Sequence, residues 1–573
     1  MTRPNLRLSA ISAVVLAATL IACAAPPSRT DRGAQAASSG SSAQASGSKR
    51  IVAAITGDLP VLNNKVIRAT LAYSAPGGAE VEDLITDGLV DLDDQGVLHA
   101  KLAEAVPSTE NGLWRVLPDG RMETTWKIRE NARWHDGNPV TTDDLLFTMM
   151  VVRDRDIPLF RDTTYELIEK VEASDARTIT ATWNQPYIQA DLLFSRDLGL
   201  PLPKHILEAP YREDKVAFSG IPYWNSEFIG AGPFRVKSFS LGTSVTLAAF
   251  DNYVLGRPKI DEIEVRFIPD TGTLLANVFS GVVEATMGRG ISLEQALQSK
   301  ELWPAGQPLM GPNSWIVIFP QFLDPTPTAV GDVRFRKALM YALDRQQMVD
   351  TIQAGLIPVA HAFLNPKDPD FPAIQNDAVR YDYDPRQAAR LIEEMGQTRA
   401  ADGLYRDASG QRLTAEIWTS GGLDIQVKSM FSTADQWKQA GVDAEPIIVA
   451  PQRWNDREYV AKFPAFRMNR QPNSLTNLKS LQTAQTPLPT NNYVGQNYSR
   501  YMNPEFDALI DRYFTTIPKA ERTRALGDVV RHMTDQLTLM GLYYDVQPAL
   551  VANRISGVTP ETSGWNAHLW EIR

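Results

Sequence analysis

The stretch from residue 126 to residue 144 reads WKIRENARWHDGNPVTTDD, and it contains the end of a strand, a turn and the start of a helix. Residues 122–128 predict the strand, and residues 134–137 predict the turn. Thr141 and Asp144 predict a capping box, because the hydroxyl can accept a hydrogen bond from an early helical N–H and acids favour the positive helix end. Leu145, Met149 and Val152 continue at the spacing of one helix face. The unit predicts a strand followed by a helix that packs on a core.

Downstream segments repeat this alternation. Asp384 followed by Pro385 predicts a helix over 385–395, which ends at Gly396. Residues 413–418 and 445–449 predict two strands, and the helical spacing over 427–437 between them ends at Gly441. Such a βαβ unit implies parallel strands with a right-handed crossover. With a buried strand at 51–55, where the globular part begins, the pattern indicates the α/β class.

The first 48 residues have a different character. Arg3 and Arg7 precede an apolar run over 8–21, which has the length of a secretory signal and falls short of the roughly 20 residues that span a membrane. Ala22 before Cys23 resembles a bacterial lipobox, so Cys23 is the predicted lipid attachment site; the alternative is a secretory peptide with a chance cysteine. Residues 24–48 contain no large apolar side chain, which predicts a flexible tether.

Composition and motifs exclude several function classes. The 573 residues carry a net charge of −10, which gives no general attraction to nucleic acid. One cysteine supplies neither an intramolecular disulfide nor a thiolate metal cage. The sequence has no nucleophile elbow, phosphate-binding loop or zinc-protease motif, and no two of its six histidines lie two to four residues apart. The GAGPF stretch at 230–234 predicts a tight turn into a strand. We therefore expect no catalytic residues, no metal and no cofactor.

Five stretches together resemble the extracytoplasmic solute-binding proteins of family 5, which serve ABC importers for peptides, oligopeptides and nickel. The first is the stretch 126–144 quoted above. The others read GAGPFRVK at 230–237, DVRFRKALMYALDR at 332–345, DPRQAARLIEEMG at 384–396 and NPEFDALI at 503–510. They occur in the order of the family's own motifs, so the resemblance covers nearly the whole chain after the tether.

The resemblance implies an α/β, two-lobed fold like that of type II periplasmic binding proteins, with an extra subdomain inserted in the first lobe. We expect the following layout: signal peptide 1–22; lipidated Cys and disordered tether 23–49; first part of lobe 1, 50–88; inserted subdomain 89–222; second part of lobe 1, 223–310; lobe 2, 311–541; and the C-terminal return to lobe 1, 542–573. The expected protein is an extracytoplasmic monomer, lipid-anchored to the bacterial cell membrane.

The implied function is capture of a peptide or peptide-like solute in a cleft between the lobes, and its delivery to the permease and ATPase subunits of an ABC importer. A non-peptide solute, such as an oligosaccharide or another anionic or neutral ligand, is one alternative. A ligand sensor is another, and the sequence favours an extracytoplasmic enzyme least. Expected ligand contacts lie in loops at strand ends. They are Glu80, Trp315, Trp418, Thr419, Trp454, Asn469, Arg470 and Trp565.

One position departs from the peptide-binding pattern. Peptide-binding relatives carry an Asp in the second lobe that pairs with the amino terminus of the peptide. In this sequence Met468 stands at the apparent counterpart, and Arg470 lies close by. The departure favours a ligand with an anionic or neutral end over one that depends on its free amino group.

Overall fold

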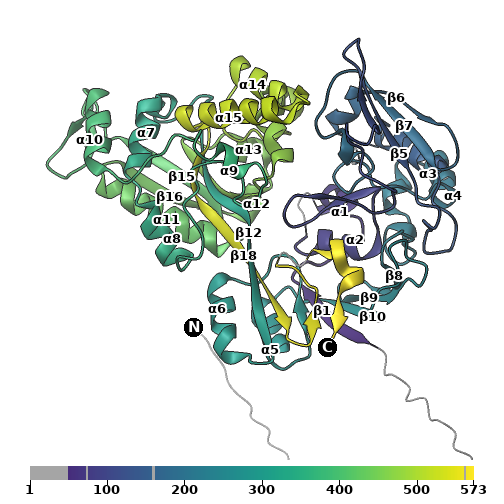
Figure 1. Ribbon diagram of the computed structural model, residues 1–573. Coiled ribbons are helices and arrows are strands. Elements are labelled where there is room, and N and C mark those ends of the chain that lie inside the picture. Colours follow the sequence, from purple (N-terminus) through teal and green to yellow (C-terminus); the bar gives the residue numbers. More distant parts are fainter. Residues whose placement is uncertain (1–48, 72–74, 158–159, 161, 561–562) are drawn as a thin grey trace, which may run out of the picture. The chain divides into compact units, whose positions relative to one another are not determined.

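The computed structural model describes residues 49–71, 75–157, 160, 162–560 and 563–573. The predicted signal peptide, Cys23 and nearly all of the predicted tether lie outside these ranges. The described residues form one compact unit, along which helices and strands alternate (Figure 1).

A mixed ten-stranded sheet organises the described chain, in the order β16-β15-β17-β12-β18-β11-β1-β10-β9-β8. Its strands are β1 Arg50–Ile55, β8 Phe234–Ser240, β9 Ser244–Ala249, β10 Glu262–Phe267, β11 Ala285–Thr286, β12 Gly306–Pro320, β15 Thr414–Ser420, β16 Asp443–Val449, β17 Phe466–Gln471 and β18 Met540–Ala552. The first strand begins at the place that the sequence predicts for the start of the globular part. β1 pairs in parallel with β10 and β11.

The two long strands β12 and β18 connect the two ends of this sheet (Figure 1). They pair antiparallel from Gly306 with Ala552 to Ile318 with Met540. Trp315 and the residues after it in β12 also pair with β17, whereas β18 pairs with β11 near its own end. The register of the long pair shifts between Pro312 and Ser314, which marks a β-bulge and a local bend. The predicted lobe boundaries at 311 and 541 fall within these two strands, and they stay a prediction.

The βαβ unit is present as the sequence predicts. Helix α11, Asp424–Gln439, connects β15 and β16, and the two strands pair in parallel. Gly441 ends this connection with φ of 101°, a conformation that favours glycine. Helix α10, Pro385–Glu394, begins at Asp384, whose side chain accepts hydrogen bonds from two backbone N–H groups of the first turn.

The segment predicted as the inserted subdomain contains its own four-stranded sheet, in the order β4-β5-β7-β6. Its strands are β4 Trp114–Val116, β5 Met122–Lys127, β6 Ile168–Ala173 and β7 Thr178–Trp183, and the short pair β2 Val90–Leu92 and β3 Leu98–Ala100 precedes them. Helix α3, Thr142–Val152, starts with the predicted capping box, in which the N–H of Thr141 donates to Asp144 over 2.9 Å. The indole of Trp134 donates to the same carboxylate over 3.3 Å, so this motif holds the turn against the helix.

The turn at 230–234 connects this segment to β8. Gly230 and Gly232 lie so close to the backbone of Ile85 that a Cβ at either position would approach it within 2.5 Å. The backbone N–H of His135 donates to the carbonyl of Gly230 over 2.9 Å. The GAGPF stretch therefore serves as a close backbone contact before a strand, which agrees with its prediction.

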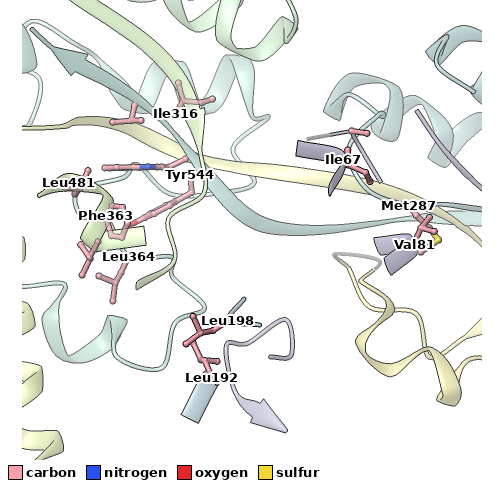
Figure 2. Packing of buried hydrophobic residues seen from close by; sticks show 14 of the residues in the cluster. Ile67, Val81, Leu192, Leu198, Met287, Ile316, Phe363, Leu364, Leu481 and Tyr544 are labelled. Carbon is pink, nitrogen blue, oxygen red and sulfur yellow. The ribbon is translucent and has the colours of Figure 1, made fainter. Parts of the chain in front are cut away.

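The remaining helices and short strands complete the described chain. They are α1 Asn64–Leu71, α2 Gly78–Ile85, α4 Lys204–Glu213, α5 Thr271–Phe279, α6 Leu293–Leu302, α7 Val333–Tyr341, α8 Arg345–Ile352, α9 Phe371–Ile374, α12 Pro451–Trp454, α13 Arg457–Ala461, α14 Pro504–Thr515, α15 Lys519–Gln536, β13 Thr398–Arg399, β14 Tyr405–Arg406, β19 Ile555–Ser556 and β20 Glu571–Ile572. Buried apolar side chains form one continuous cluster. Figure 2 shows part of it, where Phe363 and Leu364 lie beside Tyr544 of β18.

Candidate functional site

Charged side chains from four separate elements converge near the bulge in the long strand pair. Glu80 lies in the first turn of α2, Arg289 follows β11, Arg470 lies in β17 and Asp545 lies in β18. The charges of Glu80, Arg470 and Asp545 all act on the guanidinium of Arg289. Gln547, two residues after Asp545, contacts Arg470. We call these five residues the central polar cluster.

Arg470 and Asp545 form a buried ion pair in this cluster, with side chains 8% and 6% exposed. The carboxylate of Asp545 also accepts hydrogen bonds from the Nε2 of Gln353 over 3.0 Å and from the Oγ of Ser314 over 3.5 Å. The Nη2 of Arg470 donates to Oε1 of Gln547 over 3.2 Å. The pair is electrically neutral, and its neighbours fix both side chains in place.

Arg289 differs from Arg470 in lacking such a partner. Among the described residues, no carboxylate lies within 4.0 Å of its guanidinium and no acceptor hydrogen-bonds to it. Burial lowers the pKa of Arg289, and the positive charge of Arg470 lowers it further, while Glu80 and Asp545 oppose the shift. The half-buried guanidinium is therefore a desolvated cation whose donors are free for another group.

The backbone holds Arg289 at this place. Its carbonyl accepts a hydrogen bond from the Oγ1 of Thr56 over 2.6 Å. Gly288 has a φ of 64°, and a Cβ there would lie 2.5 Å from the backbone nitrogen of Gly77. Only glycine allows this approach, because any side chain would collide with the start of α2. The close approach brings the residue after it, Arg289, next to the helix that carries Glu80.

Glu80 supplies the acidic counterpart. Burial raises the pKa of its carboxyl group, although its own amide and the positive charges of Arg196 and Arg289 oppose the shift. In the part of the chain that the structure describes, its side chain has no partner other than its own backbone amide. The cluster therefore offers an unpaired acceptor as well as an unpaired donor.

Three of the other predicted ligand residues lie in the core around β12 and β15. Trp315 is 3% exposed, and its ring meets that of Phe363 edge to face at 5.7 Å. The cavity beside Trp315 measures about 20 Å³, enough for a water molecule and too small for a solute. Trp418 is 7% exposed and stacks on Tyr459 at 4.8 Å. Thr419 is fully buried, and its hydroxyl donates to the carbonyl of Met468. Their predicted ligand contacts stay predictions.

Trp454 and Asn469 both contact Arg467. The guanidinium of Arg467 lies 4.5 Å from the ring centre of Trp454 and 4.2 Å from that of Tyr498, so it is held between two aromatic faces. Its Nε donates to Oδ1 of Asn469 over 3.2 Å. This arrangement is separate from the ion pair of Arg470, and the structure brings neither Trp454 nor Asn469 into the central polar cluster.

Trp565 lies against the inserted segment. Its ring stacks on that of His99 with a centroid distance of 5.1 Å, and its carbonyl accepts a hydrogen bond from Lys101. The indole Nε1 is buried and has no partner among the described residues. Of the predicted ligand residues, Glu80 and Arg470 both act on the charge of Arg289, whereas Trp565 lies in a separate contact.

Arg289 and Asp545 are the two charged residues of the cluster that the sequence reasoning missed. Asp545 is the single charged residue in the otherwise apolar and polar-neutral run MGLYYDVQPALVA, all of which is buried in β18. Arg289 stands between two glycines directly after a short strand. A lone charge within a buried strand, and one flanked by glycines at a strand end, are the signals that could have identified them.

The described residues contain no group of three His, Cys, Asp or Glu side chains able to hold a metal ion. Over the same residues, no helix has the length and apolarity needed to span a bilayer.

Comparison with known protein families identifies relatives of the chain. The model of bacterial extracellular solute-binding proteins, family 5 Middle, matches residues 102–492.

Individual relatives are similar over nearly the full length. The oligopeptide-binding protein AppA of Bacillus subtilis is 22% identical over 536 residues, which cover 90% of this chain and 91% of that protein. The crystal structure of an oligopeptide-binding protein from Thermus thermophilus with a pentapeptide is similar with a TM-score of 0.71 at 22% identity, covering 91% of this chain and 96% of the other. NikA from Brucella suis, solved in complex with Fe(III)-EDTA, is similar with a TM-score of 0.72 at 18% identity, covering 91% and 100%.

These likenesses confirm the fold predicted from the five motifs, that of the type II periplasmic binding proteins. The matched family model covers more than half of the chain and includes most of the inserted segment and all of β17. Family 5 proteins act outside the cytoplasm as the substrate-binding components of ABC transporters. The chain therefore belongs to the bacterial extracellular solute-binding proteins of family 5, and it is a solute-binding protein rather than an enzyme.

Proposed function

We propose that the chain captures a peptide-like solute between its two lobes, at the central polar cluster, and delivers it to the permease of an ABC importer. In this proposal the lobes are divided as the sequence predicts, with the inserted subdomain at 89–222. Cys23 carries the lipid that retains the protein at the membrane surface, and the residues after it act as the tether. The protein works as a monomer.

One observation supports the central polar cluster as the ligand site. Arg289 and Glu80 lie near β1 and β11, whereas Arg470 lies in β17, on the other side of the long strand pair. The charges of both Glu80 and Arg470 nevertheless act on Arg289. Polar groups that keep unused donors and acceptors where two parts of a fold meet are typical of a ligand site. A solute bound there would contact both sides, and it would stabilise a closed form to the extent that it binds that form better.

The relatives support a peptide-like solute. The similar protein from Thermus thermophilus was solved with a pentapeptide, and AppA is named as an oligopeptide-binding protein. The similar NikA was solved with Fe(III)-EDTA, which shows that proteins of this fold also take compact, carboxylate-rich ligands. A peptide-like molecule with an acidic group combines both features.

Native mass spectrometry of the full chain, purified in mild detergent, tests the proposal. We expect a co-purified mass, or binding of peptides from an added protein digest, without any change in the mass of the bound molecule over time. Small-angle scattering should give a smaller radius of gyration when the bound molecule is added back. Steady conversion of the ligand to a product, or binding without any change in the radius, would contradict the proposal.

A further inference from the structure

We infer that Arg289 recognises an anionic group of the solute, and that a carboxylate on the ligand is required for tight binding. This inference rests on the proposed function and adds the chemical class of the ligand. Geometry provides the argument. A Cβ at Gly288 would lie 3.2 Å from the Oε2 of Glu80, so the chain at Arg289 runs beside that carboxylate, while Arg470 already holds Asp545 in a buried ion pair.

Among the described residues, the carboxylate of Asp545 forms no ion pair within 4.0 Å of Arg289, and other donors hold it in place. Its two oxygens accept hydrogen bonds from Gln353, Ser314 and Arg470. Asp545 lowers the positive potential at Arg289 from a distance without pairing with it. Arg470 and Asp545 together thus leave the charge of Arg289 uncompensated.

Glu80 does not neutralise Arg289 by contact either. Over the described ranges, no ion pair within 4.0 Å joins the two side chains, although their charges attract each other. Burial also raises the pKa of Glu80, which favours its neutral form and makes it a weaker counter-ion for Arg289. Its oxygens remain free to accept hydrogen bonds from N–H or O–H groups of a ligand.

Without a ligand, the desolvation of the Arg289 guanidinium is therefore energetically unfavourable, and a bound anion would offset it. Arg289 is half-buried beside another guanidinium, and a desolvated charge is stable only when it is paired and hydrogen-bonded. A guanidinium presents its donors as a fork that matches both oxygens of a carboxylate. A carboxylate placed at Arg289 would gain two such bonds and would also relieve the repulsion from Arg470.

The opposite end of a peptide has no equivalent partner in β17. Met468 is fully buried in that strand and offers no charge to an amino group. Asp545, a carboxylate that contacts β17 here, is already paired with Arg470. We therefore expect the acidic group of the ligand to matter and its free amino group to be dispensable.

The test uses one enzymatic protein digest in three forms: untreated, methyl-esterified so that its carboxylates are neutral, and acetylated so that its amines are neutral. Each form is added to the full chain in mild detergent, and retained peptides are quantified by native mass spectrometry. We compare the parent with Arg289→Met, with Arg289→Lys, which keeps the charge, and with Arg257→Met. Arg257 pairs with Asp251 and Asp261 on the surface and serves as the matched control.

We expect the parent and Arg257→Met to retain untreated and acetylated peptides at similar levels, and to retain at least tenfold less of the esterified ones. Arg289→Met should retain little of any form, and Arg289→Lys should restore part of the binding, while the melting temperature of each variant shows that it is folded. Equal retention of esterified and untreated peptides by the parent, or unchanged retention by Arg289→Met, would overturn the inference and leave solute capture standing. If no form of the digest binds, the peptide-like ligand of the proposed function is wrong, and the inference fails with it.

Discussion

Replacing Asp545 by asparagine removes the charge that neutralises Arg470 while keeping a side chain of nearly the same size. Both side chains of the pair are less than a tenth exposed, so water cannot replace the lost partner. Removal of one member of a buried ion pair costs about 3–5 kcal/mol, because the other charge stays buried without compensation. Asn can still accept the hydrogen bond from Gln353, so we expect the lower end, about 3 kcal/mol of unfolding free energy.

Urea unfolding, followed by circular dichroism and tryptophan fluorescence, measures this cost as a lower midpoint at an unchanged m value. The control is Glu208→Gln, which breaks an exposed ion pair with Arg212 and should cost at most about 0.5 kcal/mol. Raising the salt concentration should leave the effect of Asp545→Asn nearly unchanged, because buried charges are poorly screened.

A double variant separates the ion pair from general damage to the strand. Arg470→Met in the Asp545→Asn background leaves no unpaired charge, so the double variant should be more stable than the sum of the two single effects predicts. We expect a coupling energy of about 1–3 kcal/mol. If Asp545→Asn alone costs less than about 1 kcal/mol, or if the two changes are additive, the pair does not stabilise the junction as argued.

Four further outcomes are expected. Cys23→Ser should release the protein from the membrane fraction or block its processing, and unchanged fractionation would contradict the predicted lipid site. Lys479→Met should lower the unfolding free energy by about 1 kcal/mol, because the ammonium lies 4.2 Å from the ring centre of Tyr187, and the exposed Lys300→Met control should not. Trp418→Ala should cost about 3–5 kcal/mol of stability, as expected for a buried indole; a smaller cost would favour its predicted ligand contact. Burial raises the pKa of Asp191 to about 7, so its folded carboxyl stays protonated until a higher pH than in the unfolded chain. This group therefore contributes a loss of stability as the pH rises from about 4 to 7. Asp191→Asn should remove that contribution, and identical pH profiles of the parent and the variant would contradict it.

Local signals account for the parts of the fold that the sequence predicts. The capping box at Thr141, the Asp384 start of α10 and the glycine end at Gly441 each involve residues within a few positions of one another. A helix start or stop is decided by backbone groups of a single turn, so the residues that satisfy them are visible in the sequence. The parallel pairing of β15 with β16 follows equally from the length of the helix between them.

The long strand pair could not be predicted in this way. β12 and β18 pair over residues that are more than 200 positions apart, so their register depends on the whole fold between them. Arg470 was identified because it lies near a family motif, but its partner Asp545 lies on the distant strand. The aromatic candidates illustrate the converse. Trp418 lies near the end of β15 as expected, whereas Trp315 lies well inside β12, and both are packed in the core. An indole next to a strand end suits either place, and sequence alone does not separate the two.

Under the proposed function, the two arginines of the cluster would have different roles in ligand binding. Arg470 keeps its counter-ion whether or not a ligand is present, because Asp545 belongs to the same long strand pair that holds β17 in register. Arg289 is anchored from the other side of the sheet by Thr56 and by the contact of Gly288 with Gly77, and its charge is left for the ligand. Binding energy can favour a closed form only through contacts that the open form lacks. A ligand that binds Arg289 with its carboxylate and also contacts the Arg470–Asp545 pair would supply such contacts, because separating the two sides would break the contacts with that pair and leave only those with Arg289.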